Sequence, residues 1–270
     1  MKFAAARRVL RNVAAVYDRR WICTALAALT ALLGGAAKAG DPAPSGLQAF
    51  TFHGVPYLVH DVDPKKDDLQ MFLKFNKGVY IHDFTGLQTY LDGKGEKLLF
   101  AANAGMFQPD FTPCGLLVLD GNQIAPLNTD DGQGNFYMKP NGVFLINQRH
   151  EAHIVNSADY VDELSPAAWA TQSGPMLVLR GDINPDFNAS SKSLKIRSGV
   201  GVRQDGLAVF ALSRQPVSFY DFATLFRDRL KCPNALFLDG DISAFYVPGA
   251  KYNLPQTFGP MIGVVAKQNP

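Results

Sequence analysis

Several features that often reveal a protein's function are scarce or missing in this chain of 270 residues. The formal net charge is only +2, and part of the positive excess lies in the first twenty residues, so nucleic acid is not expected as a partner. There is no Gly-x-Ser-x-Gly motif, and a serine hydrolase triad therefore has little support. The 47% apolar and 19% charged content is ordinary for a globular protein and excludes dominant disorder.

The histidines lack the spacing of metal ligands. Of the five, only His150 and His153 are close in sequence, in what reads as a turn, where a solvated pair is more common than a zinc site. Asp130 and Asp131 before Gly132 could contribute to a calcium site or simply form a polar loop. We therefore expect no metal and no other cofactor.

The first forty residues predict export. A basic region precedes an apolar run from Ile22 to Leu33, and a small-residue box, Ala37-Lys38-Ala39, follows it. This order is typical of a cleaved signal peptide, and the run is shorter than the roughly 20 residues of a membrane-spanning helix. The sequence predicts a signal peptide at 1–39, a linker at 40–47 and one domain at 48–270. The mature protein would be periplasmic or secreted, without a membrane span.

Cysteine is rare, with three residues in the chain. Cys23 would leave with the signal peptide, so Cys114 and Cys232 would remain. In an oxidising compartment these two could form one disulfide or stay as two inert buried thiols. A catalytic cysteine would need a reduced thiol in that compartment, which makes it the weaker hypothesis.

The chain from residue 48 onward alternates short apolar stretches with polar clusters, and it has few helical patterns. Strands are expected at Gln48–Phe52, Val55–Val59, Leu69–Phe75, Lys97–Ala102, Gly115–Leu119, Gln123–Leu127, Gly142–Ile146, Met176–Leu179, Arg197–Val202, Leu207–Leu212, Ala235–Leu238 and Met261–Val265. Helices are expected at Thr85–Asp92, with Thr85 as N-cap and Gly93 as its stop, and at Phe219–Leu230, capped by Ser218. Short connections favour an α+β fold on a mainly antiparallel, strongly twisted sheet, in a single domain.

Five strand ends carry polar residues and glycines: 103–107, 139–142, 172–175, 197–201 and 239–243. Such ends hold ligand groups on a rigid scaffold, and Asn, Gln, Ser and Arg side chains with nearby backbone amides suit an anion. We expect Asp239, Arg197 and Asn103 to be catalytic, with Arg197 as a clamp for phosphate and Asp239 handling a proton. We expect substrate-binding residues at Asn141, Gln172, Ser173, Asp110, Asp241 and Ser243. A carboxylate pair, Asp239 with Asp241 or Asp110, would be the alternative arrangement of a glycosidase.

Read together, these blocks resemble the phosphodiester glycosidase family, particularly its exported bacterial branch. The resemblance runs from about Phe52 to Val265 and is carried by Asn-Ala-Gly-Met-Phe at 103–107, Pro-Asn-Gly-Val-Phe at 140–144, Thr-Gln-Ser-Gly-Pro-Met at 171–176, Arg-Ser-Gly-Val-Gly at 197–201 and Leu-Asp-Gly at 238–240. It implies a twisted sheet and hydrolysis of the bond between a sugar's anomeric carbon and a phosphodiester oxygen. By position, Asn103, Arg197 and Asp239 correspond to the family's polar blocks.

Asp241 departs from the Leu-Asp-Gly-Gly that the resemblance leads us to expect. Its negative charge would repel a phosphodiester unless it is paired or binds a cation. The expected substrate is a glycan or sugar phosphodiester of the envelope or extracellular space. The competing hypothesis is a non-catalytic envelope protein that binds a phosphorylated or acidic glycan in the same pocket.

Overall fold

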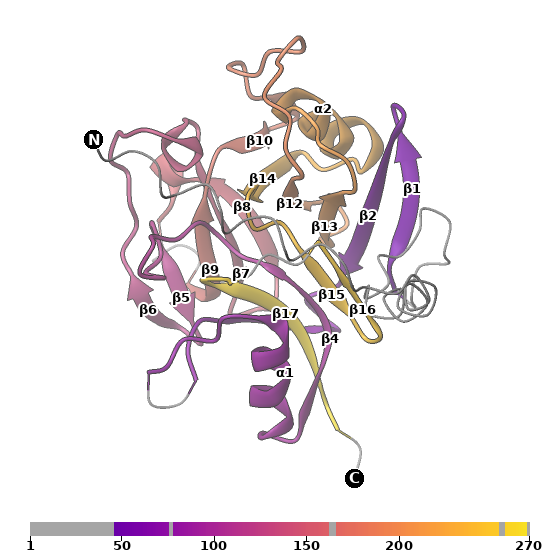
Figure 1. The fold of residues 1–270 in the computed structure, drawn as a ribbon. Helices are drawn as coiled ribbons and strands as arrows, with labels where there is room; N and C mark the ends of the chain where they lie inside the picture. The colour runs from indigo at the N-terminus through magenta and orange to yellow at the C-terminus, as the bar shows by residue number, and fades with distance from the viewer. Residues whose placement is uncertain (1–45, 76–77, 162–165, 254–256, 269–270) are drawn as a thin grey trace, which may run out of the picture. The chain divides into compact units, whose positions relative to one another are not determined.

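Three antiparallel sheets form the described structure, which is a computed structural model covering residues 46–75, 78–161, 166–253 and 257–268 (Figure 1). The first sheet has the spatial order β1 (Gln48–Phe52), β2 (Val55–Val62), β13 (Ala208–Ser213), β12 (Ser198–Val202), β14 (Asn234–Asp239), β10 (Met176–Leu179) and β11 (Asp182–Ile183). The second has the order β16 (Ala250–Tyr252), β15 (Phe245–Val247), β4 (Glu96–Asn103), β17 (Met261–Lys267) and β3 (Asp68–Phe72). The third has the order β6 (Asn122–Ala125), β5 (Leu117–Leu119), β9 (Ala167–Ser173), β7 (Gly142–Asn147) and β8 (Ala152–Asn156).

The sheets share one aromatic junction centred on Phe210 of β13. Its ring lies 5.3 Å from the ring of Phe100 on β4 and 5.9 Å from that of Phe144 on β7, measured between centroids. All three side chains are fully buried. The three rings lie on one strand from each sheet, so they join the sheets into a common core. Burying one such side chain stabilises the fold by about 1.5–3 kcal/mol.

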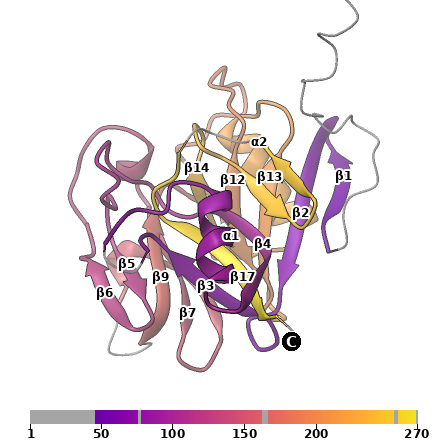
Figure 2. The same ribbon diagram turned by 60° about the horizontal axis from the view of Figure 1, so that its bottom comes forward.

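Two short helices cover the sheets. Helix α1 (Phe84–Asp92) lies over β3, β4 and β17 in Figure 2 and packs Phe84, Leu87 and Leu91 into the core of the second sheet. Helix α2 (Phe219–Thr224) continues as a π-helical turn, Leu225–Arg229, and covers one face of the first sheet. The predicted mainly antiparallel α+β fold in a single domain is therefore confirmed.

The helix caps were predicted correctly in one case and wrongly in the other. Ser218 caps α2, since its hydroxyl accepts a hydrogen bond from the Asp221 amide at 3.1 Å. The N-cap of α1 is Asp83 rather than Thr85, because the Asp83 carboxylate accepts from the Gly86 amide at 2.7 Å. An ionised carboxylate is a strong acceptor near the positive end of a helix, and Thr85 instead lies within the first turn.

Five strands were not predicted as strands: β8, β9, β11, β15 and β16. The most consequential is β9, because it is the central strand of the third sheet and carries the polar residues 171–173. Its sequence, Ala-Ala-Trp-Ala-Thr-Gln-Ser, has neither clear alternation nor a run of β-branched residues. Pairing with β5 and β7 on its two sides determines its conformation instead.

The predicted disulfide is absent, and among the described residues Cys114 and Cys232 are both free. They occupy different environments. The Cys232 thiol is buried beside α2 at the back of β12, where a Cβ added to Gly201 would come within 2.6 Å of its sulfur. The Cys114 thiol is half-buried and accepts a hydrogen bond from Gln108 Nε2 at 3.4 Å.

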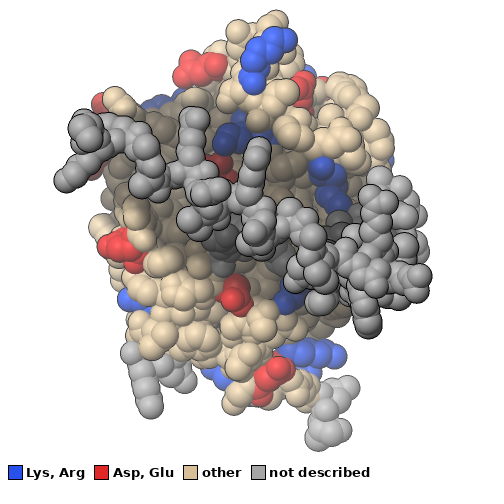
Figure 3. Space-filling model, viewed as in Figure 1, with Lys and Arg blue, Asp and Glu red and all other residues tan. Residues whose placement is uncertain are grey.

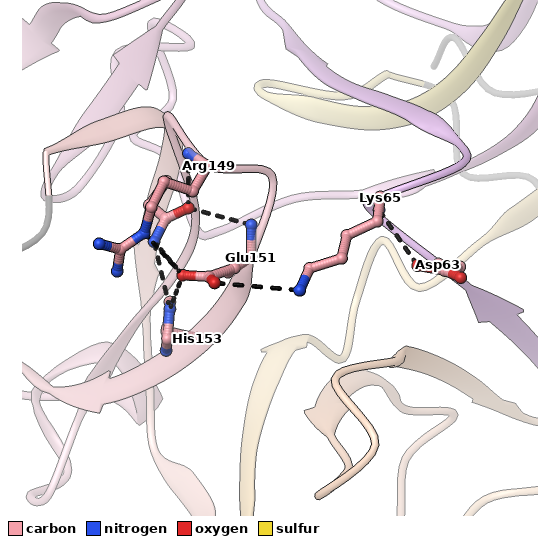
Figure 4. Close-up of polar contacts among 6 residues, drawn as sticks. Asp63, Lys65, Arg149, Glu151 and His153 are labelled. Atoms are coloured by element: carbon pink, nitrogen blue, oxygen red, sulfur yellow. Dashed lines mark hydrogen bonds and ion pairs between the residues drawn. The ribbon is translucent and has the colours of Figure 1, made fainter.

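A polar network ties the turn between β7 and β8 to the loop that follows β2 (Figure 4). The Glu151 carboxylate is 3.1 Å from Arg149 Nε, 3.9 Å from His153 Nε2 and 3.9 Å from Lys65 Nζ. Hydrogen bonds from Asn147 and then Arg149 lower the pKa of Glu151. These are solvent-exposed ion pairs, which contribute little to stability, so the network orients loops more than it stabilises the fold.

The described surface carries acidic and basic side chains side by side. Figure 3 shows small groups of both signs over the visible face. Within the described residues, no helix is long and apolar enough to cross a membrane. The predicted signal peptide and most of the predicted linker lie outside the described residues, while Ala43–Pro270 clusters as one unit.

Candidate active site

Asn103, the last residue of β4, links two sheets. Its side-chain Oδ1 accepts a hydrogen bond from the Ser198 hydroxyl at 2.9 Å and another from the Ala244 amide at 3.2 Å. Its Nδ2 lies 3.4 Å from the Ala104 carbonyl oxygen, and the residue is fully buried. Ser198 begins β12 of the seven-stranded sheet, whereas Asn103 ends β4 of the second sheet. The Asn103 side chain therefore joins the ends of strands from two sheets.

Asp239 lies at the end of β14, directly opposite Ser198 in the ladder. Its carbonyl oxygen accepts from the Ser198 hydroxyl at 3.2 Å and also from the Ser243 hydroxyl. Ser198 therefore contacts two of the three predicted catalytic residues, through the Asn103 side chain and the Asp239 main chain. Two residues far apart in sequence are brought together through this one hydroxyl.

Burial raises the pKa of the Asp239 carboxyl, and the nearby negative charge of Asp241 raises it further. Backbone amides act in the opposite direction, since Asp239 Oδ1 accepts from the Asp241 amide at 2.8 Å and the Ile242 amide at 3.4 Å. In the described part of the chain, Asp239 forms no ion pair with a basic side chain. A desolvated carboxyl with a raised pKa is typical of a group that transfers protons.

Two predicted substrate-binding serines lie at the same junction. The Ser173 hydroxyl, at the end of β9, donates to the Leu238 carbonyl oxygen at 2.8 Å. The Ser243 hydroxyl contacts the carbonyl oxygen of Ile196 at 3.5 Å as well as that of Asp239. Both serines are fully buried, so they brace the end of β14.

Arg197 precedes Ser198 in the chain, but its side chain makes different contacts. Its Nε donates to the Val217 carbonyl oxygen at 2.9 Å and its Nη2 to the Ser193 carbonyl oxygen at 3.1 Å. The guanidinium carbon lies 3.6 Å from the centroid of the Phe219 ring. The residue is 1% exposed, and burial lowers its pKa to about 10, with the Asp241 charge acting in the opposite direction, so it remains a cation at neutral pH.

The contacts of Arg197 leave its charge unpaired. Among the described residues it takes part in no salt bridge, and the two recorded acceptors are neutral carbonyl groups. A buried guanidinium without a carboxylate partner favours the approach of an anion. The structure does not bring this side chain into contact with Asn103 or Asp239, which are linked through Ser198 instead.

Asp241 is paired, which answers the concern about its charge. Its carboxylate lies 3.0 Å from Lys195 Nζ, and both side chains are well exposed. Lys195 runs beside the same turn, since a Cβ added to Gly240 would lie 3.8 Å from Lys195 Cβ. In the turn at 239–241, the Asp241 carboxylate therefore has the Lys195 ammonium beside it.

Gln172 and Asn141, both predicted to bind substrate, have their polar atoms engaged within the protein. Gln172 Oε1 accepts from the Leu116 amide at 3.0 Å and the Asn128 amide at 2.9 Å, while its Nε2 donates to the Asn128 carbonyl oxygen and the Ser157 hydroxyl. Asn141 Nδ2 donates to the Phe136 carbonyl oxygen at 2.9 Å. Both are 1% exposed. These contacts position the loops around β5, β7 and β9.

Asp110 lies on the exposed loop between β4 and β5, where its carboxylate accepts from the Thr112 hydroxyl at 2.6 Å and the Thr112 amide at 3.0 Å. These bonds lower its pKa, the opposite of the shift at Asp239. Nearer to Asp239 is Cys114, whose pKa is raised by burial and then by the Asp239 charge. That thiol is therefore poorly suited to act as a nucleophile.

Sequence reasoning missed Ser198, Lys195 and Thr171. Thr171 holds the loop after Asn103, because its hydroxyl accepts from the Gly105 amide at 3.0 Å. A Cβ on Gly105 would come within 2.1 Å of the Gln172 carbonyl oxygen, which explains the glycine at this point. Ser198 could have been found from its place in Arg-Ser-Gly-Val-Gly, one of the five polar blocks.

The described residues form several cavities but no cluster of metal ligands. No group of three or more His, Cys, Asp or Glu side chains there could hold a metal ion. Cavities of about 380, 320 and 280 Å³ are present, and the residues that line them do not include Asn103, Arg197 or Asp239.

The fold and this junction define a class of protein, an antiparallel α+β domain in which buried polar residues from three sheets meet at the end of β14. The chain belongs to the phosphodiester glycosidase family, whose model matches residues 96–264. That span includes Asn103, Arg197 and Asp239. Membership of this family supports a glycosidase-like role.

The chain is also similar to individual proteins in sequence or in fold. The chain is 35% identical over 190 residues to the uncharacterized protein YigE of Escherichia coli (strain K12), which covers 70% of this chain and 74% of YigE. The fold of the present chain is similar to that of the catalytic domain of zebrafish N-acetylglucosamine-1-phosphodiester alpha-N-acetylglucosaminidase, auto-inhibited by its pro-peptide. The TM-score is 0.57, the sequence identity is 16%, and 81% of each chain is covered. It is also similar to a hypothetical protein from Synechocystis, with a TM-score of 0.52, 13% identity, and coverage of 82% of this chain and 61% of that one. The two structural similarities concern the fold alone.

Proposed function

We propose that this protein is an exported glycosidase that hydrolyses the bond between a sugar's anomeric carbon and a phosphodiester oxygen in an envelope or extracellular glycan. In this reaction the carbon–oxygen bond breaks, water adds to the anomeric carbon, and the products are a free sugar and a phosphomonoester. The observation that carries the proposal is the half-buried residue Asp239, whose carboxyl pKa is raised by desolvation and whose main chain is bonded to Ser198 and, through it, to Asn103.

In this proposal Asp239 transfers the proton of the attacking water or of the leaving oxygen. Burial keeps its carboxyl protonated to a higher pH than a solvated aspartate, and general acid or base catalysis works best when the pKa approaches the working pH. The amides of Asp241 and Ile242 fix the orientation of Oδ1. Ser198 and Asn103 act as positioning residues, because they hold the main chain at the end of β14.

The phosphodiester would be attracted by the cations near this strand end. Arg197 contributes a buried positive charge without an ion-pair partner among the described residues, and Lys195 lies along the same segment. An anion near them gains electrostatic stabilisation as the phosphate leaves. Lys195 also offsets the charge of Asp241, which removes the objection to an anionic substrate.

Export is part of the proposal and rests on the basic and apolar pattern at residues 1–39. Cell fractionation of the full-length protein tests it. Processing near Ala39, seen as a new N-terminus by mass spectrometry, is the expected result. Retention of the intact chain in the cytoplasm would contradict it.

The reaction is tested by incubating the purified mature protein with sugar 1-phosphate diesters in water enriched in oxygen-18. Release of sugar labelled at its anomeric oxygen is expected, and label in the phosphate would show cleavage of the other bond and overturn the assignment. Asp239→Asn and Arg197→Ala are compared with the unchanged protein. Full turnover by Asp239→Asn would exclude the role given to Asp239. Diester binding without turnover would favour a non-catalytic glycan-binding protein.

A further inference from the structure

The largest of the three cavities lies between the second and third sheets, away from the residues of the candidate active site. It has a volume of about 380 Å³ and is lined by residues from β3, β4, α1 with the turn after it, the hairpin at Asp120, and β9. Small-molecule sites have volumes of about 300–1,000 Å³, so the cavity is large enough for a ligand.

Aromatic and polar side chains share its walls. Trp169 and Tyr90 are half-buried and supply apolar ring faces, while Gln70 and Asp120 supply an amide and a carboxylate. The Lys94 ammonium lies 4.7 Å from the centroid of the Tyr90 ring. The apolar face of a pyranose ring packs on aromatic rings, and its hydroxyl groups pair with amides and carboxylates.

Glu96 provides an independent indication of a ligand. It is 9% exposed, and its Oε1 lies 2.5 Å from Lys267 Nζ. Its Oε2 is buried and has no hydrogen-bond partner among the described residues. Leaving a buried acceptor unpaired costs about 1–3 kcal/mol, more for a charged group, and a ligand hydroxyl group would satisfy it.

We propose that this cavity is a second saccharide-binding site, in which a sugar unit of a glycan packs on Trp169 and Tyr90 and donates hydroxyl hydrogen bonds to Glu96 and Asp120. The site goes beyond the proposed hydrolytic function and does not depend on it. It anchors the protein to a glycan through a sugar unit other than the one that reacts.

Trp169 is both the probe and the target of the test. The chain has two tryptophans, so Trp21→Phe in the full-length protein leaves Trp169 as the sole indole fluorophore. Maltotetraose and chitotetraose are titrated to millimolar concentrations, with fluorescence and saturation-transfer NMR as readouts. A saturable fluorescence change and transfer to the saccharide protons are expected for at least one of the two.

Four variants define the site. Trp169→Ala is expected to weaken saccharide binding at least tenfold by NMR, whereas Trp169→Phe, which keeps a ring, changes it by less than threefold. Glu96→Gln and Gln70→Ala are expected to weaken it severalfold, and Gln70→Ala keeps the test valid if Glu96→Gln unfolds through loss of the Lys267 pair. Leu99→Ala, an exposed position in a separate cavity of about 320 Å³ that shares no lining residue with this one, is the matched control and should bind normally.

Two results would overturn the proposal. The first is no binding of either saccharide, or unchanged binding by Trp169→Ala. The second is a response to tetramethylammonium without a response to saccharides, which would indicate a site for cationic ligands. Hydrolysis of a small sugar 1-phosphate diester by Trp169→Ala should equal that of the unchanged protein, so the two proposals succeed or fail separately.

Discussion

The Ser198 hydroxyl lies 2.9 Å from Asn103 Oδ1, across the boundary between two sheets. The same hydroxyl donates to the Asp239 carbonyl oxygen at 3.2 Å. A hydroxyl has one hydrogen to donate, so these two acceptors share it. These two hydrogen bonds make the position of the end of β14, where Asp239 lies, depend on the second sheet.

Asn103→Ala is expected to lower kcat on a sugar 1-phosphate diester by about tenfold or more, because the end of β14 loses its tether. The buried Ser198 hydroxyl and Ala244 amide would lose a partner, at about 1–3 kcal/mol of unfolding free energy per unpaired group. Steady-state kinetics and urea denaturation measure both effects. Asn184→Ala is the matched control, since Asn184 is also a buried asparagine that bonds the main chain, at the Met176 carbonyl oxygen. Equal loss of kcat in both variants would contradict a specific role for Asn103.

Asp239→Asn is expected to reduce kcat/KM by about 10²–10⁴-fold, the usual contribution of a general acid or base. The stability effect has a definite sign. A carboxyl whose pKa is raised in the folded state stabilises the fold below the unfolded-state pKa, and this contribution is lost as pH rises through the folded pKa. Relative to the unchanged protein, Asp239→Asn should therefore gain unfolding free energy as the pH is raised from acid to neutral.

Asp228→Asn is the control with the opposite sign. The side-chain hydrogen bond from Arg227 lowers the pKa of Asp228, so its contribution is present above the unfolded-state pKa and lost in acid. Urea denaturation at about pH 3 and pH 7 separates the two variants. A pH dependence of the same sign in both would contradict the raised pKa of Asp239.

Arg197→Gln is expected to raise KM for a phosphodiester substrate by about 30-fold, which corresponds to about 2 kcal/mol for an interaction with a charged group. The affinity for a neutral sugar inhibitor should change much less, because only the anion senses the lost charge. Arg203→Gln is the control, since that guanidinium is paired with Asp61 at 2.8 Å. Equal losses for the charged and neutral ligands would indicate that Arg197 only supports the fold around Phe219.

Thiol labelling tests the absence of a disulfide. Iodoacetamide should modify the half-buried Cys114 slowly in the native protein, because burial and the Asp239 charge both raise its pKa. Cys232 should react only after unfolding, since it is buried and its pKa is raised to about 12. Peptide mapping by mass spectrometry distinguishes these two from Cys23. A Cys114–Cys232 cross-linked peptide from unreduced protein would contradict the structure.

Local patterns predicted much of the fold. Apolar runs next to glycine or proline located β10 and β14 within one or two residues, because these strands are buried and short. β9 could not be found in this way. Its place between β5 and β7 is a tertiary property, and most of its residues, three alanines with a glutamine and a serine, have little intrinsic preference for the extended state.

The candidate site was predictable in part. Asn103, Ser173, Asp239 and Ser243 were all expected from polar residues at strand ends, and the structure brings them to one junction. Composition could not show that Gln172 Oε1 and Asn141 Nδ2 are bonded to nearby backbone groups. Which amide remains available to a ligand depends on neighbours that the sequence does not place.

The contacts that hold the junction together also determine at what stage of folding it can form. Asn103 and Ser198 are 95 positions apart in the chain, and Asn103 and Ala244 are 141 apart. Contacts of such high sequence separation slow folding, because a long loop must close before they stabilise anything. The junction is therefore expected to be among the last parts of the protein to reach its native arrangement, so the appearance of activity during refolding would report the final docking of the sheets rather than the formation of any one of them.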